Sequence, residues 1–194
     1  MTIAAVLLAA GASRRYGSSD KLLAPLWGTP LVVHAARALR SIAPAHLIAV
    51  VRSDDVARVL TGFTITTPKE DAPDQADSLR AGVALASACG ASRILVALGD
   101  MPFVTADLLK DVVAACTDAR PGATTDGDRI TPPACFPIIM AAQLMALKGD
   151  RGAASLLCNL PARAVVEAEA ALLRDIDSPD MLHVAQACSN DTRT

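Results

Sequence analysis

Short apolar runs that alternate with helix-like segments are the feature that most constrains the fold of this chain. The runs are "IAAVLLAA" (residues 3–10), "HLIAVV" (46–51), "FTITTP" (63–68), "RILVALGD" (93–100) and "ARAVVEAEA" (162–170). The first, second and fourth are rich in Val, Ile and Leu, which is typical of strands buried on both faces. Alternating strands and helices favour a parallel sheet covered on both faces. We therefore expect an α/β fold, a Rossmann-like three-layer sandwich with a mostly parallel central sheet.

Residues that cap helices indicate where the helices begin. Thr29 and Pro30 form a cap and first-turn pair before "LVVHAARALR", Thr105 precedes "ADLLKDVVAAC", and Ser178 precedes a segment that contains "MLHVAQAC". Ligands of such folds bind beyond the carboxyl ends of the strands. The loop at residues 11–21 and the loop at residues 99–104 each follow a buried strand, so we expect the two loops to lie side by side.

Composition narrows the class of protein. The 194 residues are 52% hydrophobic but 3% aromatic, which suits one domain of parallel strands under alanine-lined helices, over residues 1–188, with a disordered polar tail at 189–194. The net charge of -2 argues against a nucleic-acid partner. No apolar run reaches the roughly 20 residues of a membrane span, and the five cysteines form no C-x-x-C pair. We expect a cytoplasmic protein with no membrane partner.

The loop in "LLAAGASRRYGSSDKLL" (residues 7–23) has the composition of a phosphate-binding loop. Gly11 and Gly17 let backbone N–H groups approach an anion, and Arg14, Arg15 and Lys21 add full positive charges. The loop fits neither the Walker pattern nor the dinucleotide pattern of glycines. A solvated loop whose arginines face water is the alternative that the spacing leaves open.

The same residues carry a family resemblance. The stretch resembles the signature of the molybdopterin nucleotidyltransferase-like (NTP transferase) family, L-A-[AG]-G-x-S-x-R-x-G-x-x-[KN]-K-L-L. Four further blocks, "DSLRAGV", "LGDMPFV", "LKGDRGAASLL" and "DIDSPDML", resemble later blocks of that family in the right order. Within the family, the chain is most similar to the cytidylyltransferases of the molybdenum cofactor.

The resemblance implies transfer of CMP from CTP to the phosphate of molybdenum-bound molybdopterin, with release of pyrophosphate. The acceptor phosphate is already ionised, so the reaction needs charge neutralisation and in-line positioning and no general base. By resemblance, Arg15, Lys21 and Asp100 are the catalytic residues, and Asp100 and Asp177 hold Mg²⁺. Mg²⁺ favours one or two carboxylates together with phosphate oxygens and water. Asp177 could equally belong to a plain helix start.

The resemblance also divides the site into a nucleotide side and an acceptor side. The nucleotide side comprises Leu8, Ala9, Ala10, Gly11, Ala12, Ser13, Arg14, Gly17, Gln75, Ser78 and Arg80, and the acceptor side comprises Asp150, Arg151 and Gly152. Ala at position 10, where similar proteins have Ala or Gly, favours CTP over GTP. The stretch "ITPPACF" (residues 130–136) departs from the family's G-x-P-x-x-F, which leaves the acceptor's identity open.

Other functions remain open at this point. They are GTP-dependent transfer to molybdopterin, nucleotidyl transfer to another small phosphate such as a sugar phosphate, and a non-catalytic accessory protein that binds the cofactor. A molybdenum hydroxylase of the xanthine dehydrogenase type would be the partner that receives the product. An NAD-dependent dehydrogenase is disfavoured by the missing glycine pattern.

Overall fold

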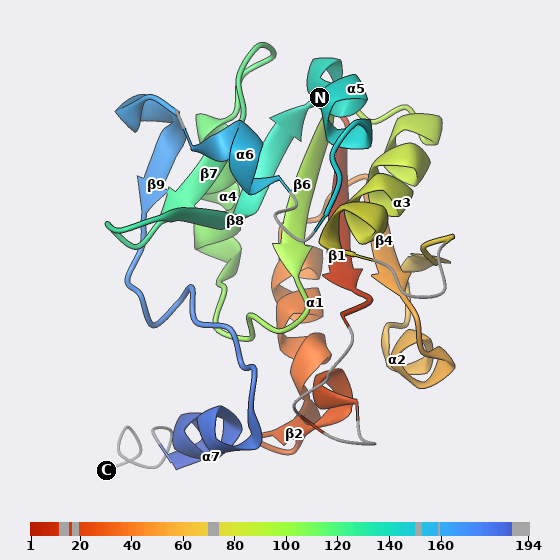
Figure 1. Ribbon diagram of the computed structural model, residues 1–194, viewed down its shortest axis with the longest axis vertical. Helices are drawn as coiled ribbons and strands as arrows, with labels where there is room; N and C mark the ends of the chain where they lie inside the picture. Colours follow the sequence, from red (N-terminus) through yellow and green to blue (C-terminus); the bar gives the residue numbers. More distant parts are fainter. Residues whose placement is uncertain (12–15, 17–19, 70–73, 150–152, 159, 188–194) are drawn as a thin grey trace.

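The computed structural model describes residues 1–11, 16, 20–69, 74–149, 153–158 and 160–187. Within them, seven strands form a central sheet in the order β5-β4-β1-β6-β8-β7-β9 (Figure 1). The strands of this sheet are β1 (Ile3–Ala9), β4 (His46–Val51), β5 (Thr64–Thr66), β6 (Arg93–Leu98), β7 (Gly122–Thr125), β8 (Ile130–Pro137) and β9 (Val165–Glu167). Each of the five apolar runs supplies one of these strands, as predicted.

Strand β1 lies at the centre of the parallel half of the sheet. It pairs in parallel with β4 and with β6, and β4 pairs in parallel with the short strand β5. Residues 4–7 of β1 are fully buried, since helices cover both faces. The arrowheads of β1, β4 and β6 point to the same end of the molecule (Figure 1). Lys21, at the end of the segment that follows β1, accordingly contacts Asp100, which follows β6, as expected for the described parts of the two loops.

Two strands of the other half of the sheet, β7 and β8, were missed in the sequence. Strand β8 is antiparallel to both β6 and β7, and the register between β7 and β8 shifts at Ala123 and Thr124. The sequence of β8, "ITPPACFP", contains three prolines and that of β7, "GATT", is short and begins with glycine, so neither gives a strong strand signal. The sheet is accordingly mostly parallel with an antiparallel insertion at β8.

Helices cover both faces of the sheet and make three layers. Helices α1 (Leu31–Ser41), α2 (Asp54–Val59) and α4 (Ala106–Ala115) pack on one face through a core that includes Leu7 and Leu109. Helices α3 (Gln75–Ala88), α5 (Ala141–Met145) and α6 (Ala154–Leu157) cover the other face, where Val6 and Leu79 lie. Alternate residues of β1 thus face opposite layers. None of the described helices is long and apolar enough to span a membrane.

Two of the three predicted helix caps are confirmed. Thr105 accepts a hydrogen bond from the Leu108 amide at the start of α4, and Ser178 accepts one from the Met181 amide at the start of α7 (Pro179–Ala187). The Thr29 cap was wrong, because Thr29 pairs with Leu26 in a hairpin of β2 (Pro25–Leu26) and β3 (Thr29–Pro30). Helix α1 begins directly after this hairpin.

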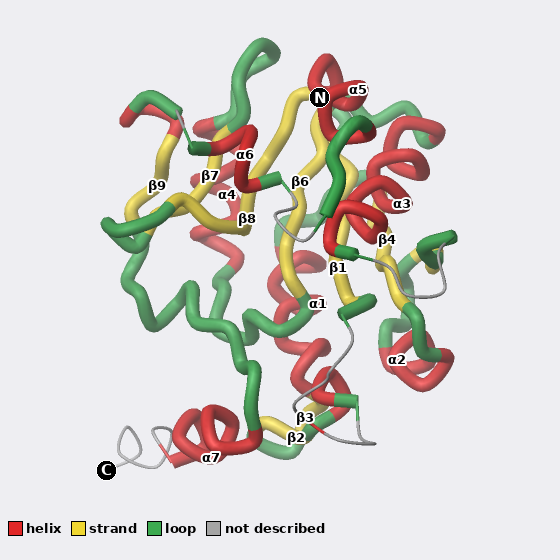
Figure 2. The backbone as a smooth tube through the Cα atoms, viewed as in Figure 1, coloured by secondary structure: helices red, strands yellow, loops and turns green. Residues whose placement is uncertain are grey.

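The hairpin and α7 form a small second cluster beyond the carboxyl end of the parallel strands. Figure 2 shows β2 and β3 beside α7. Leu26 and Leu31 pack there against Ile176 and Leu182, all of them buried, and Gln186 Nε2 donates to the Pro25 carbonyl at 2.6 Å. This packing brings the last part of the chain back to the end of the sheet where the loops after β1 and β6 lie.

Close packing of α3 on the sheet gives a first prediction. A Cβ atom on Gly82 would overlap Val6 Cγ1 and would lie 3.1 Å from Val50 Cγ2. Because β-branched valines have little freedom to move, Gly82→Ala should lower the free energy of unfolding by about 1–3 kcal/mol, although alanine is the better helix former. Denaturant unfolding measures this loss. Ser87→Ala on the same helix is the control, with a change within about 0.5 kcal/mol, and an unchanged stability of Gly82→Ala would contradict the packing.

Candidate active site

A buried lysine joins two aspartates at the end of the parallel strands. Lys21 Nζ lies 2.8 Å from Asp100 Oδ2 and 2.7 Å from Asp177 Oδ1. The lysine begins a short 3-10 turn, η2 (Lys21–Leu23), which Asp20 caps by accepting a hydrogen bond from the Leu22 amide at 3.0 Å. Leu22 is buried in the core, so the turn is anchored on both sides of the lysine. The lysine itself is only 8% exposed.

Close approach of the backbone places Asp100 in this cluster. The Gly99 amide donates to the Leu8 carbonyl at 2.9 Å, directly beyond the end of the pairing between β1 and β6. A Cβ atom on Gly99 would lie 3.3 Å from both that carbonyl oxygen and Ala9 Cβ, which is tighter than ordinary contact. Glycine at position 99 therefore lets the two loops converge, and the next residue is Asp100.

Asp177 reaches the cluster because of a buried isoleucine. The Ile176 amide donates to the Asp100 carbonyl at 2.9 Å, and the Ile176 side chain is completely buried in the cluster of the hairpin and α7. The isoleucine is thus fixed between the two segments, and the adjacent Asp177 carboxylate contacts Lys21. Asp175, on the other side of Ile176, was not predicted as part of the site.

Burial and the neighbouring charges shift the pKa values of Lys21 and Asp175 in the cluster. Burial opposes the charge of Lys21, but Asp100 and Asp177 outweigh that effect and raise the pKa of the ammonium above its usual value. Burial, and then repulsion by Asp177 and Asp100, raises the pKa of the Asp175 carboxyl. Asp100 Oδ1 is buried and has no hydrogen-bond partner among the described residues. Lys21 therefore contacts only one of the two Asp100 oxygens, and the other, Oδ1, is available to a further ligand.

These carboxylates are of the kind that can hold a divalent cation. Across the described ranges, no group of three or more His, Cys, Asp or Glu side chains could hold a metal without other ligands. Magnesium, however, normally takes one or two carboxylates and completes its shell with water and phosphate oxygens. Asp100, with its unpartnered buried oxygen, and Asp177 are of the right type and number.

Tyr16 is a further neighbour that sequence reasoning missed. Its hydroxyl is buried and lacks a hydrogen-bond partner among the residues that the structure describes. Burial raises the pKa of this phenol, while the charge of Lys21 lowers it and that of Asp177 raises it. The sequence signal for Tyr16 was its position within the loop, between Arg15 and Gly17.

The predicted nucleotide side is described in part. Leu8, Ala9, Ala10 and Gly11 lie at the end of β1, where Ala9 and Ala10 are buried and Gly11 is exposed. The remaining predicted residues of the loop and of the acceptor side lie outside the described residues. They are Ala12, Ser13, Arg14, Arg15, Gly17, Asp150, Arg151 and Gly152.

An apolar pocket lies beside the ends of β1 and β6, on the α3 side of the sheet. Its volume is about 60 Å³. Among the described residues of the lining, Gln75 has the one polar side chain, and it is exposed at the first position of α3. The rest of the lining is apolar and consists of Leu8, Leu79, Val96, Leu98, Pro132, Ala134, Phe136, Ala153, Ala154 and Leu157. Pro132 belongs to the stretch in which the sequence departs from the family pattern.

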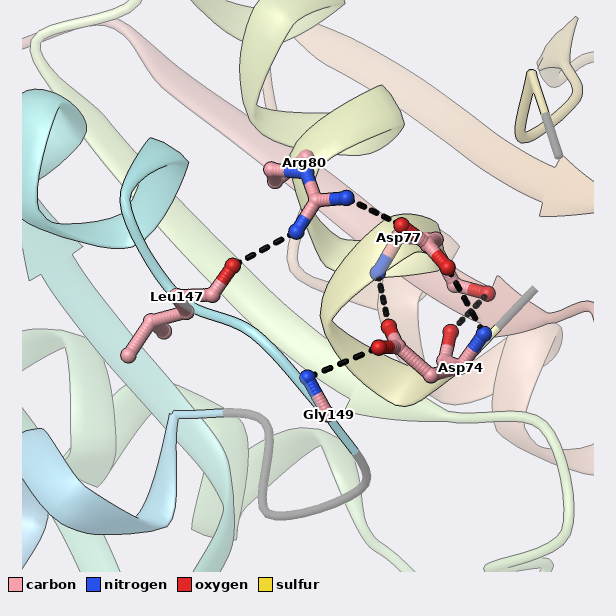
Figure 3. Close-up of polar contacts among 6 residues, drawn as sticks. Asp74, Asp77, Arg80, Leu147 and Gly149 are labelled. Atoms are coloured by element: carbon pink, nitrogen blue, oxygen red, sulfur yellow. Dashed lines mark hydrogen bonds and ion pairs between the residues drawn. The ribbon is translucent and has the colours of Figure 1, made fainter.

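The other two residues predicted to recognise the nucleoside point elsewhere. Ser78 is buried, and its hydroxyl donates to the Asp74 carbonyl at 3.4 Å. The Arg80 guanidinium contacts the Asp77 carboxylate and the Leu147 carbonyl (Figure 3). Asp74 and Asp77 form a reciprocal capping box at the start of α3. The spacing of the two aspartates could have revealed this box in the sequence.

Comparison with solved structures shows a shared fold. A nucleotidyl transferase from Methanothermobacter is similar in fold, with a TM-score of 0.83 at 21% identity over 99% of both chains. The Mycobacterium tuberculosis protein Rv0371c in complex with manganese has a TM-score of 0.80 at 23% identity, covering 96% of this chain and 99% of that one. Both proteins therefore share the α/β architecture of this chain over almost its whole length.

The sequence identifies the family. Residues 5–165 match the MobA-like NTP transferase domain, and the chain belongs to this family. The purine catabolism protein PucB of Bacillus subtilis is 32% identical over 189 residues, which are 90% of this chain and 91% of PucB. A molybdenum cofactor guanylyltransferase from Rhodobacter capsulatus is 32% identical over 117 residues, which are 59% of this chain and 60% of that protein.

The raised pKa of Asp175 predicts how stability depends on pH. Burial and repulsion in the folded protein disfavour the ionised form of this carboxyl, so Asp175→Asn should raise Tm at pH 7. The gain should shrink as the pH falls and vanish below the usual value of about 3.8, where the acid is protonated in both states. Thermal unfolding from pH 3 to pH 8 measures the difference. The exposed Asp111→Asn is the control, and a gain that does not change with pH would contradict this account.

Proposed function

We propose that this nucleotidyltransferase transfers CMP from CTP to the terminal phosphate of molybdenum-bound molybdopterin and releases pyrophosphate. The observation that carries the proposal is the contact of Lys21 with both Asp100 and Asp177 at the carboxyl end of the parallel strands. This is the place in an open α/β sheet where nucleotides bind. Membership of the MobA-like family supplies the reaction class.

The chemistry requires several negative charges to meet. An oxygen of the acceptor phosphate attacks the α-phosphorus of the triphosphate, and the bond from that phosphorus to the oxygen that bridges to the β-phosphate breaks. Lys21, together with Arg15 of the preceding loop, would neutralise phosphate oxygens during this step. Asp100 and Asp177 would hold the divalent cation. That cation, when bound, supplies positive charge to the triphosphate, and the manganese complex of the Mycobacterium protein supports its use.

The choice of base rests on Ala10. Its side chain is almost completely buried at the end of β1, where the resemblance places the nucleotide, and alanine there favours CTP. GTP is the second candidate, because the Rhodobacter relative is named a guanylyltransferase. The product would serve a hydroxylase of the xanthine dehydrogenase type, and the name of the Bacillus relative, a purine catabolism protein, supports this use.

Pyrophosphate release tests the proposal. Molybdenum-loaded molybdopterin and Mg²⁺ are supplied with CTP or GTP in separate reactions, and CTP should give the faster turnover. Asp100→Asn should lower kcat by about 100-fold or more, because charge stabilisation at the phosphates is lost. Asp107→Asn is the matched control, since Asp107 is an exposed aspartate paired with Lys110 on α4, and it should keep normal turnover.

Each other outcome changes the account. Faster turnover with GTP would keep the reaction and reject the interpretation of Ala10. Release of pyrophosphate with a sugar 1-phosphate but not with molybdopterin would replace the acceptor. Binding of CTP without pyrophosphate release from any acceptor would favour the non-catalytic accessory protein.

A further inference from the structure

We propose that Asp74 and Arg80 are positioning residues that tie residues 147–149 to the start of α3 and so fix the width of the apolar pocket. The two walls of the pocket come from distant parts of the chain. Gln75 and Leu79 of α3 line one side, and Ala153, Ala154 and Leu157, in and next to α6, line another. The assignment of this pocket to the nucleotide, on the side where Leu8 and Gln75 were predicted, rests on the proposed function, whereas the tie itself does not.

Asp74 uses its two carboxylate oxygens for two different tasks. Oδ1 accepts a hydrogen bond from the Asp77 amide at 2.7 Å, which caps α3. Oδ2 accepts one from the Gly149 amide at 2.7 Å, a residue 75 positions further along the chain (Figure 3). The Ala76 amide also donates to the Gly149 carbonyl at 3.3 Å. Gly149 is therefore bound through both its amide and its carbonyl to the first turn of α3.

Arg80 makes the second connection, one turn further along the helix. Its Nη1 donates to the Leu147 carbonyl at 2.5 Å, and its Nη2 pairs with Asp77 Oδ1. The other Asp77 oxygen accepts the Asp74 amide at 2.8 Å. The two aspartates and the arginine thus form one connected network, in which Asp77 fixes both Asp74 and the guanidinium.

Helix capping alone does not require this arrangement. A single side-chain oxygen satisfies a cap, and Ser53 caps α2 in that way through the Val56 amide. Helix α3 is also anchored in the core by Leu79, Val83 and Ala86. The second Asp74 oxygen and the Arg80 guanidinium reach across to residues 147–149 instead. Ala153, which lines the second wall of the pocket, follows Gly149 by four residues in the sequence.

Two conservative variants separate the tie from the cap. An asparagine side chain has only one acceptor oxygen. Asp74→Asn therefore keeps the hydrogen bond from the Asp77 amide but loses the one from the Gly149 amide. Arg80→Lys keeps the positive charge but not the two-pronged donor that reaches Asp77 and Leu147 together. Arg58→Gln is the matched control, since Arg58 pairs with Asp55 with the same spacing on α2 and is exposed.

Amide hydrogen exchange tests the tie without any assumption about function. Exchange of the Gly149 amide in Asp74→Asn should be about tenfold faster than in the wild type, while amides in the middle of α3 keep their protection. Arg58→Gln should leave the Gly149 amide unchanged. Unchanged exchange of Gly149 in Asp74→Asn, or equal loss of protection throughout α3, would overturn the proposal.

Steady-state kinetics test the consequence for the pocket. With molybdopterin and CTP or GTP, Asp74→Asn and Arg80→Lys should each raise the KM for the nucleotide about tenfold, with kcat and the KM for molybdopterin changed less than about twofold. A fall in kcat alone, or an equal rise of both KM values, would overturn the positioning role. If the wild type itself turns over no molybdopterin, the proposed function fails, and exchange at Gly149 still decides whether the tie exists.

Discussion

The burial of one ammonium group between two carboxylates is the interaction on which the site depends. Lys21 is separated from Asp100 by 79 residues and from Asp177 by 156 residues, yet it contacts both. A buried lysine is costly unless it is paired. The fold supplies the pairing through the close approach at Gly99 and the buried anchor at Ile176, so the backbone around the cluster is determined before any substrate arrives.

Much of the fold follows from local patterns. The runs that became β1, β4 and β6 are continuous and apolar, because strands buried on both faces need no polar side. Strands β7 and β8 could not be found in the same way, since the prolines of β8 and the short β7 give a turn-like signal while their partners are set by the tertiary fold. The Thr29 cap failed for a related reason, because pairing with Leu26 took the residue into a hairpin.

The candidate site was only partly accessible from the sequence. Lys21 and Asp100 follow buried strands, so the topology alone predicts that their loops meet. Asp177 was found by resemblance, and its contact with Lys21 depends on the packing of Ile176, which no local pattern shows. The sequence also did not show that one Asp74 oxygen caps α3 while the other binds the Gly149 amide. The sequence could not show that Arg80 reaches the Leu147 carbonyl, because that contact joins segments 67 residues apart.

Binding of Mn²⁺ in the presence of a non-hydrolysable CTP analogue tests the central claim most directly, because the ion can be followed by electron paramagnetic resonance. The account predicts that wild-type protein with the analogue binds Mn²⁺ more tightly than the analogue does alone. In Asp100→Asn the affinity should fall to that of the free analogue complex, because a carboxylate ligand is lost. Equal Mn²⁺ affinity in the wild type and in Asp100→Asn would contradict the claim that this cluster is the centre for nucleotidyl transfer.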